Sequence, residues 1–280
     1  MSKIENTAHL PNPADFEQET LHFLKSFNFD GVKPSLAHIT AIARHFSRLP
    51  YENISKILKH SQHQQENMFR LPDELIADHF EWHAGGTCFS LTYFLMGIFE
   101  LLGYRAQPLI CDLNWGSNNH SAVLLTFSGM NYLIDPGYMI FKPLPFTGEN
   151  IQSQISSDTG ISLQFQAEVD KYALYTFRKN QYTRRYQFSP KPISLNKFAD
   201  YWNISFELPG MDDLILTQVS GYEMLYIQGD FVKITSPQQI QKFREADRAE
   251  SLIQSQFKIP MEKVEEARHI LQQRKIQNES

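Results

Sequence analysis

The sequence predicts an α+β fold with three successive segments, and two observations support this prediction. Before residue 88, apolar residues recur at helical spacing between polar turn signals. After Gly103 the pattern changes to short β-prone runs, and the chain ends in a mixed tail with further helical patterns. A chain of 280 residues is long enough for segments that each bury a core.

Helices are predicted throughout the first part of the chain. Residues 12–27 open with an Asn-Pro start signal, and Ser35 is the expected N-cap of a second helix that stops at Pro50. Residues 71–83 form a third amphipathic pattern. Residues 88–102 are almost wholly apolar, so this helix is expected to be buried on most sides.

Short β-prone runs follow the helices. A turn at 128–129 joins two of them into a hairpin, and a turn at 229–230 joins a later pair. The predicted strands cover residues 104–111, 120–127, 131–138, 171–177, 181–188 and 222–234. The predicted helices in this part of the chain cover residues 194–203, 236–257 and 260–277.

The composition argues against several classes of protein. A formal net charge of −5 leaves no excess of Lys and Arg to neutralise nucleic-acid phosphates. The first residues lack the plan of a signal peptide, and the apolar stretches are too short to span a bilayer. We therefore expect a cytoplasmic protein with no nucleic-acid or membrane partner. The 2 cysteines, Cys88 and Cys111, are too few for a disulfide scaffold and should be free thiols.

Cys88 stands where a helix N-terminus is predicted. Free backbone N–H groups and the positive end of the helix dipole favour a thiolate there, and the same N–H groups can stabilise an oxyanion. Gly85 and Gly86 are expected to permit close contact between the backbone and a ligand. The alternative for a lone cysteine beside a buried helix is an inert core thiol, so the chemistry requires a partner.

His120 and Asp135 are the predicted partners of Cys88. His120 opens a β-prone run directly after a polar loop, and Asp135 closes the next run. If these strands pair across the turn at 128–129, residue i faces roughly residue 257 − i, which brings Asp135 near the His120 end. Each residue alone has a simpler explanation, a solvent-facing strand end for His120 and a turn starter for Asp135. Together the three residues form the thiol–imidazole–carboxylate set of covalent acyl transfer.

Several motifs resemble those of the arylamine N-acetyltransferases, a family within the papain- and transglutaminase-like cysteine enzymes. "HFSRLPYENISKI" (45–57) resembles the family's His-x-x-x-[Ile/Leu]-Pro-Phe-Glu-Asn-Leu signature, and "AGGTCFSL" (84–91) resembles its Arg-Gly-Gly-x-Cys-Phe-Glu motif. "NNHSAVLL" is similar to the strand that opens with the family's catalytic His, and "YLIDPGY" to its Tyr-Leu-Val-Asp-Val-Gly-Phe stretch. The tail, with "GYEMLYIQGDFVKITS" and "LIQSQFKIPM", resembles the family's closing hairpin and its Leu-x-x-x-Phe-Gly-Ile segment.

The resemblance implies both a fold and an activity. The implied fold is a helical bundle over residues 1–87, a catalytic helix with an antiparallel β-barrel-like domain over 88–195, and an α/β lid over 196–280. The implied activity carries an acyl group from a coenzyme A thioester to Cys88 and then to an aromatic amine, hydrazine or hydroxylamine. Acetyl-CoA or another acyl thioester is the implied co-substrate, and no permanently bound cofactor is expected.

The resemblance also assigns roles to residues. Cys88 is the implied nucleophile, His120 the base and Asp135 the residue that orients His120. Aromatic residues are predicted to line an acyl or aryl pocket, namely Tyr51, Phe89, Tyr138 and Phe141. No metal is expected, because no residues have zinc-site spacing. Histidines outside the triad are interpreted as loop and helix-surface residues, namely His60, His63, His79 and His83.

The chain departs from the family pattern next to the nucleophile. Ala84 stands where the family has Arg, and Ser90 stands where it has Glu. This joint change predicts the compensated replacement of a buried ion pair, with Glu81 or His83 as nearby substitutes. Further departures lie beside the predicted pocket, at Asn119, Pro136 and Tyr138.

The sequence contains clusters of basic residues. The clusters either attract a coenzyme phosphate or the acidic surface of a carrier protein, or form a solvated face. They consist of Arg44, Arg48, Arg178, Lys179, Arg184 and Arg185.

The alternative functions are an amide synthase or macrolactam-releasing enzyme supplied by an acyl carrier protein, a hydrolase with the same triad, and a non-catalytic binding protein.

Overall fold

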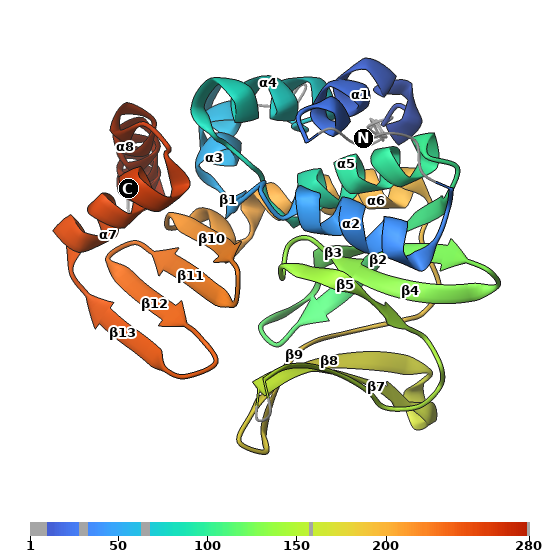
Figure 1. Ribbon diagram of the computed structural model, residues 1–280. Helices are drawn as coiled ribbons and strands as arrows, with labels where there is room; N and C mark the ends of the chain where they lie inside the picture. Colours follow the sequence, from blue (N-terminus) through green and yellow to red (C-terminus); the bar gives the residue numbers. More distant parts are fainter. Residues whose placement is uncertain (1–9, 28–32, 63–67, 157–158, 279–280) are drawn as a thin grey trace, which may run out of the picture.

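The computed structural model describes residues 10–27, 33–62, 68–156 and 159–278. Helices form the upper layer of the molecule in Figure 1, an eight-stranded sheet curves beneath them, and a five-stranded sheet stands beside it. This arrangement confirms the predicted α+β fold with a helical bundle, a barrel-like antiparallel sheet and a C-terminal α/β part. No helix in the described part of the chain combines the length and apolar character needed to cross a bilayer.

Helices come first along the chain, as the apolar spacing predicts. The Ser35 hydroxyl begins α2 as expected, because it accepts a hydrogen bond from the His38 N–H at 3.1 Å. The helix that starts at Cys88 is α5, and residues 88–99 of it are all buried. The helical bounds are η1 Pro13–Asp15, α1 Glu17–Lys25, α2 Leu36–Phe46, α3 Ile54–Gln62, α4 Pro72–Trp82 and α5 Cys88–Leu101.

The larger sheet has the strand order β5-β4-β3-β2-β9-β8-β7-β6, with every neighbouring pair antiparallel. Its two halves join where residues 111–113 of β2 pair with residues 186–188 of β9. Beyond this junction the halves face each other, which gives the barrel-like shape (Figure 1). The bounds are β2 Arg105–Leu113, β3 Gly116–Phe127, β4 Met130–Asp135, β5 Ile140–Pro145, β6 Ile151–Ser156, β7 Thr159–Gln166, β8 Lys171–Arg178 and β9 Gln181–Phe188.

The β3–β4 hairpin has the predicted register. Val123 pairs with Ile134, so paired residue numbers sum to 257. The predicted start of β3 at residue 120 is wrong, because the strand begins at Gly116. The polar residues 116–119 extend the strand beside β2, where Leu113 pairs with Gly116 across a bulge. His120 therefore lies inside a strand rather than at its mouth.

Within the described residues, six strands lie outside the predicted strand ranges, and β5 and β13 (Ile240–Arg244) among them show why; the other four are β1 (Tyr51–Glu52), β6, β7 and β10 (Ile215–Ser220). Proline at positions 143 and 145 argues against a strand, yet β5 contains both because it is an edge strand of the sheet. β13 lies in a stretch predicted to be helical over 236–257, and that prediction is wrong for its first part. Pairing with β12 (Phe231–Thr235) decides the conformation there, because tertiary contacts override local propensity.

The smaller sheet has the order β1-β10-β11-β12-β13. Its first strand comes from the helical part of the chain, since Tyr51 pairs with Thr217 of β10. This pairing joins the segment that precedes Cys88 to the C-terminal part. The remaining bounds are β1 Tyr51–Glu52, α6 Leu195–Ile204, β10 Ile215–Ser220, β11 Glu223–Gln228, α7 Ala246–Leu252, a π-helical turn Ile253–Phe257, and α8 Met261–Asn278.

Candidate active site

The loop before α5 holds Cys88 at the first position of that helix. The Glu52 N–H donates to the Gly86 carbonyl at 3.0 Å, and the Gly86 N–H donates to the Pro50 carbonyl at 3.2 Å. A Cβ on Gly85 would lie 1.8 Å from the Pro50 carbonyl oxygen, so only glycine fits there. The close backbone contact expected at Gly85 is therefore made with the chain itself rather than with a ligand.

Cys88, His120 and Asp135 lie together, as the sequence predicts. Nε2 of His120 is 2.8 Å from Oδ2 of Asp135, and the same imidazole hydrogen-bonds with the Cys88 thiol. The three residues are 7%, 3% and 0% exposed, in that order. Charges at this site are therefore shielded from water and act strongly on one another.

The Asp135 carboxylate is fixed by groups besides His120. The Tyr186 hydroxyl donates to Oδ2 at 2.5 Å, and the Tyr138 N–H donates to Oδ1 at 2.9 Å. A Cβ on Gly137 would lie 2.7 Å from Cε1 of His120 and 2.8 Å from Cβ of Cys88. The turn after Asp135 therefore both holds the carboxylate and leaves room for the thiol and the imidazole to meet.

The electrostatics favour an ion pair between Cys88 and His120. Burial raises the pKa of the Cys88 thiol, but the hydrogen bond and charge of His120 outweigh burial. The charge of Lys56 and the Ser121 N–H act in the same direction, so the pKa of Cys88 is lowered. Burial lowers the pKa of His120, but the charge and hydrogen bond of Asp135 raise it to about 10. Both shifts favour the thiolate–imidazolium pair over the neutral thiol and imidazole.

Alkylation by iodoacetamide should distinguish the two cysteines. Cys111 lies in β2 opposite His120, is fully buried, and has a pKa well above its ordinary value because of burial and the charge of Asp135. We expect modification at Cys88 alone, at a rate that changes little from about pH 7 to 9 because the thiolate is already formed. Peptide mapping by mass spectrometry over this pH range measures the rate.

The His120→Gln variant is the control for this pH profile. Without the imidazolium, the pKa of Cys88 rises, and the alkylation rate should climb with pH as it does for an ordinary thiol. A climbing profile in the unaltered protein would contradict the ion pair.

The guanidinium of Arg70 is buried against the loop before Cys88. Its Nη1 donates to the Gly85 carbonyl at 2.7 Å and to the Ser55 hydroxyl at 2.6 Å, and its Nη2 contacts the Asp78 carboxylate at 2.5 Å. The Glu52 carboxylate lies 3.8 Å from Nη1. Arg70 thus forms buried ion pairs beside this loop, whereas Glu81 and His83, the expected substitutes, are exposed.

The Arg70→Met variant should lose about 3–5 kcal/mol of unfolding free energy, because two carboxylates lose their buried cationic partner. Urea unfolding measures this loss. Lys191→Met is the matched control, since its ion pair with Asp170 is largely exposed and should contribute at most about 1 kcal/mol. Equal losses in the two variants would show that Arg70 does not stabilise the loop before Cys88.

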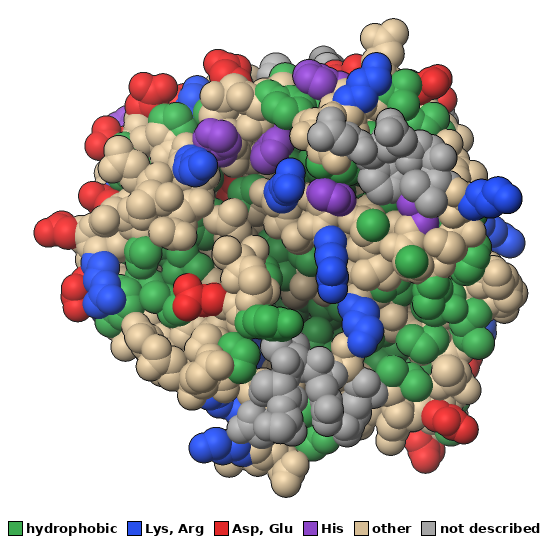
Figure 2. Space-filling model, viewed as in Figure 1, with side chains coloured by type: hydrophobic (Ala, Val, Ile, Leu, Met, Phe, Trp, Pro, Cys, Tyr) green, Lys and Arg blue, Asp and Glu red, His purple; other side chains and the backbone are tan. Residues whose placement is uncertain are grey.

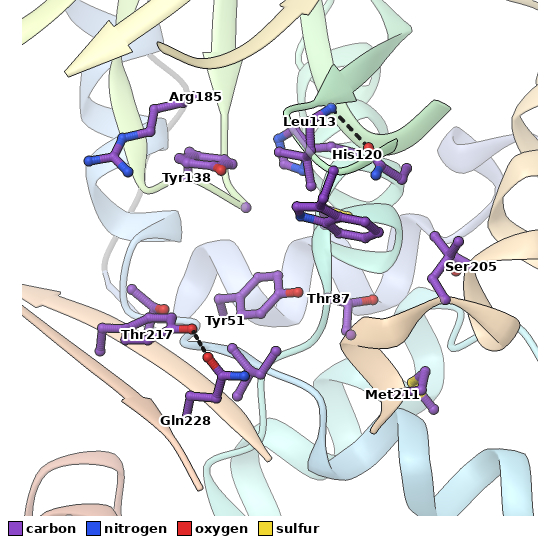
Figure 3. Close-up of a pocket in the computed structure, with 18 of the residues that line it drawn as sticks. Tyr51, Thr87, Leu113, His120, Tyr138, Arg185, Ser205, Met211, Thr217 and Gln228 are labelled. Atoms are coloured by element: carbon purple, nitrogen blue, oxygen red, sulfur yellow. Dashed lines mark hydrogen bonds between the residues drawn. The ribbon is translucent and has the colours of Figure 1, made fainter. Parts of the chain in front are cut away.

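A cavity of about 630 Å³ opens beside the triad. It lies between the two sheets, where Figure 2 shows a hollow flanked by hydrophobic side chains. In Figure 3, Tyr51, Thr87 and Ser205 point into the same space as His120 and Tyr138. The lining thus combines residues from the helical part, the barrel-like sheet and the smaller sheet.

The predicted aromatic pocket is present only in part. Tyr51, Phe89 and Tyr138 line the cavity. Phe141 does not: it packs against the apolar cluster beneath the helices. The reason is its place on the edge strand β5, on the far side of β4 from the cavity.

The residues of the predicted basic clusters do not share one environment. Arg185 lines the cavity, and its Nε donates to the Thr176 hydroxyl at 2.8 Å. Arg178 instead donates hydrogen bonds to the carbonyls of residues 236 and 237.

The histidines predicted to be loop and helix-surface residues differ in their exposure. His60 is not a simple surface residue, because it stacks on Phe206. The ring of His79 is partly buried, His83 is exposed, and His63 lies outside the described residues.

Some cavity residues had no signal in the sequence. The cavity cations Lys56, Lys233 and Lys242 come from α3, β12 and β13. Tyr186, which fixes Asp135, comes from β9. Alternation along a predicted strand could have placed Tyr186 on the inner face of β9. The position of the three lysines in the cavity wall could be predicted only from the packing of the smaller sheet.

Comparisons with known proteins agree with this geometry. An N-acetyltransferase family model matches residues 35–266. No curated protein matches the chain. The arylamine N-acetyltransferase of Mycobacterium abscessus superposes with a TM-score of 0.76 at 15% identity, over 94% of this chain and 96% of that chain.

Two further solved structures share the fold. The Mycobacterium marinum arylamine N-acetyltransferase in complex with CoA superposes with a TM-score of 0.70 at 17% identity, over 90% of this chain and 96% of that chain. A Bacillus cereus arylamine N-acetyltransferase, described with a Cys-His-Glu catalytic triad, gives 0.67 at 18% identity, over 86% of this chain and 98% of that chain. The family model spans most of the sequence, including Cys88, His120 and Asp135. The chain therefore belongs to the arylamine N-acetyltransferase family.

Proposed function

We propose that the protein transfers an acetyl group from acetyl-CoA to an aromatic amine through an acetyl-Cys88 intermediate. The observation that carries the proposal is the buried contact of Cys88, His120 and Asp135 at the N-terminus of α5, beside a cavity large enough for a small substrate. Membership of the N-acetyltransferase family supports acetyl as the group transferred.

In the first half-reaction, the Cys88 thiolate attacks the carbonyl carbon of the thioester. A C–S bond forms to Sγ, the carbonyl electrons move to the oxygen, and the free N–H groups at the start of α5 stabilise this oxyanion. When the oxyanion collapses, the bond to the coenzyme sulfur breaks and His120 gives its proton to the departing thiolate. The products are acetyl-Cys88, free coenzyme A and neutral His120.

In the second half-reaction, the amine nitrogen attacks the carbonyl carbon of acetyl-Cys88. Neutral His120 takes a proton from the nitrogen, and Asp135 stabilises the imidazolium that forms. Collapse of the second oxyanion breaks the C–S bond, releases the amide and restores the thiolate–imidazolium pair. The protons and electron pairs balance over the two steps without another reactant.

Three cations support a coenzyme A thioester as the donor. Arg185, Lys233 and Lys242 line the cavity from β9, β12 and β13. Burial lowers the pKa of Lys233, and the nearby charges of Arg185 and Lys242 lower it further, so an anion bound among them is favoured. We assign these side chains to the phosphates of the coenzyme.

Intact-mass spectrometry of the protein after incubation with acetyl-CoA tests this function. The expected result is a mass increase of one acetyl group, mapped to Cys88 and removed by an arylamine such as 4-methylaniline. The absence of an adduct would contradict the proposed donor. An adduct formed only from a carrier-protein thioester would favour an amide synthase instead.

A further inference from the structure

Lys56 is a buried cation in the wall of the cavity. It lies on α3, is 6% exposed, and lines the cavity together with Cys88 and Ser205. Its Nζ donates to the Ser205 carbonyl at 2.8 Å and to the Ser205 hydroxyl at 2.7 Å. The ammonium also lies 4.4 Å from the centre of the Phe206 ring. These contacts hold the head of the side chain in one place.

No carboxylate balances this charge within the described residues. No Asp or Glu oxygen there lies within 4.0 Å of Nζ. Lys59, one turn along the same helix, does have such a partner in Glu74. Burial lowers the pKa of Lys56, the charge of Cys88 opposes this effect and the charge of Arg274 adds to it, with a net pKa of about 7.

Apart from the thiolate of Cys88, the described lining of the cavity lacks anions. Among the described residues, its charged lining consists of Lys56, Arg185, Lys233 and Lys242, with no Asp or Glu. A lysine buried for packing alone is costly, because a methionine or leucine fills the same space without losing the hydration of a charge. The negative charge of Cys88 disappears when the thiolate is acylated, so the anion that would then stabilise Lys56 is expected to arrive with a ligand.

We propose that Lys56 recognises a carboxylate on one of the two substrates, either on the acyl chain of the donor or on the ring of the amine acceptor. This inference rests on the proposed acyltransferase function and narrows its substrate class. An ammonium has three N–H donors, and Ser205 accepts from two of them, which leaves one donor for the carboxylate. Such a charge-assisted bond in a water-poor cavity is stronger than a neutral one.

The test compares matched substrates that differ in one carboxylate. The donors are butyryl-CoA and succinyl-CoA, which differ by a methyl group in place of the carboxylate, read as the rate of acyl-adduct formation on Cys88. The acceptors are 4-methylaniline and 4-aminobenzoate, read as the rate at which acetyl-Cys88 is discharged. We expect Lys56→Met to lower kcat/KM for the carboxylate member of one pair by about 10- to 100-fold more than for its uncharged partner. Loss of the Lys56 charge also affects the Cys88 thiolate, but that effect is shared by both members of a pair. The ratio of kcat/KM within the other pair should change by less than about threefold, so the affected half-reaction identifies the source of the carboxylate.

Two further variants complete the design. Lys56→Arg keeps the charge and should retain part of the preference for the carboxylate. Lys59→Met removes a lysine from the same helix outside the cavity and should leave the preference intact. Uncharged substrates report folding and catalysis within each variant, so a loss confined to carboxylates cannot come from misfolding.

Several outcomes would overturn the proposal. One is equal kcat/KM loss for charged and uncharged substrates of Lys56→Met. Another is an equal loss for all coenzyme A thioesters with no change in the preference between the two acceptors, which would assign Lys56 to the phosphates of the coenzyme. If the unaltered protein forms no adduct with acetyl-CoA, the proposed function fails instead, and the two failures are thus distinguishable.

Discussion

Replacing Cys88 by Ala is expected to abolish the acetyl adduct and to lower arylamine acetylation by at least about 10⁴-fold. The side chain that forms the covalent bond is removed, and the remaining oxyanion donors and cavity only bind the substrates. The change leaves folding nearly intact, because the thiol is small and sits at the start of α5. Intact-mass spectrometry after a single turnover with acetyl-CoA measures the adduct directly.

Cys111→Ala is the matched control, since Cys111 is the only other cysteine of the chain. It is buried beside His120 on β2 but does not line the cavity. Its replacement should leave the adduct and the steady-state rate within about threefold of the unaltered protein. An adduct of unchanged size on the Cys88→Ala variant would show that another group carries the acetyl, and the proposed mechanism would then be wrong.

Local rules predicted the part of the site that comes from neighbouring segments. The position of Cys88 follows from one apolar run and the loop before it. The pairing of His120 with Asp135 follows from a two-residue turn, which fixes the register of the β3–β4 hairpin. The hairpin register thus predicts that Asp135 lies near His120, whereas the place of Cys88 beside them is predicted from the chemistry of a thiol–imidazole–carboxylate set and from the family resemblance.

Long-range packing decided the features that the sequence could not predict. Arg70 lies between α3 and α4 and reaches the Gly85 carbonyl while it contacts Ser55 of α3 and Asp78 of α4. β13 is a strand because β12 lies beside it, although the polar residues of 236–257 have a helical pattern. The pairing of β1 with β10 places the C-terminal part of the chain beside Cys88, and Lys56 lines the cavity that forms there. None of these contacts has a signature in a short window of sequence.

Replacing Asp135 by Asn should lower kcat/KM for acetylation by about 10³- to 10⁴-fold at neutral pH. The carboxylate raises the pKa of His120, and a neutral amide removes that effect while burial still lowers it. His120 then loses its proton at neutral pH, the pKa of Cys88 rises, and the reactive thiolate becomes scarce. The remaining activity should increase with pH as the thiol ionises, whereas the unaltered protein already holds the thiolate at pH 7. A pH–rate profile of acyl-adduct formation measures both effects.

Tyr186→Phe separates the charge of Asp135 from its positioning. This change removes the hydroxyl that donates to Oδ2 at 2.5 Å but keeps the carboxylate and its bond to His120. One lost hydrogen bond to a charged group lowers the rate by about 10-fold and leaves the shape of the pH profile unchanged. A pH profile of Asp135→Asn that matches that of Tyr186→Phe would mean that Asp135 acts on His120 through geometry alone. A rise toward alkaline pH in Asp135→Asn alone would instead identify the charge of Asp135 as the source of the thiolate–imidazolium pair.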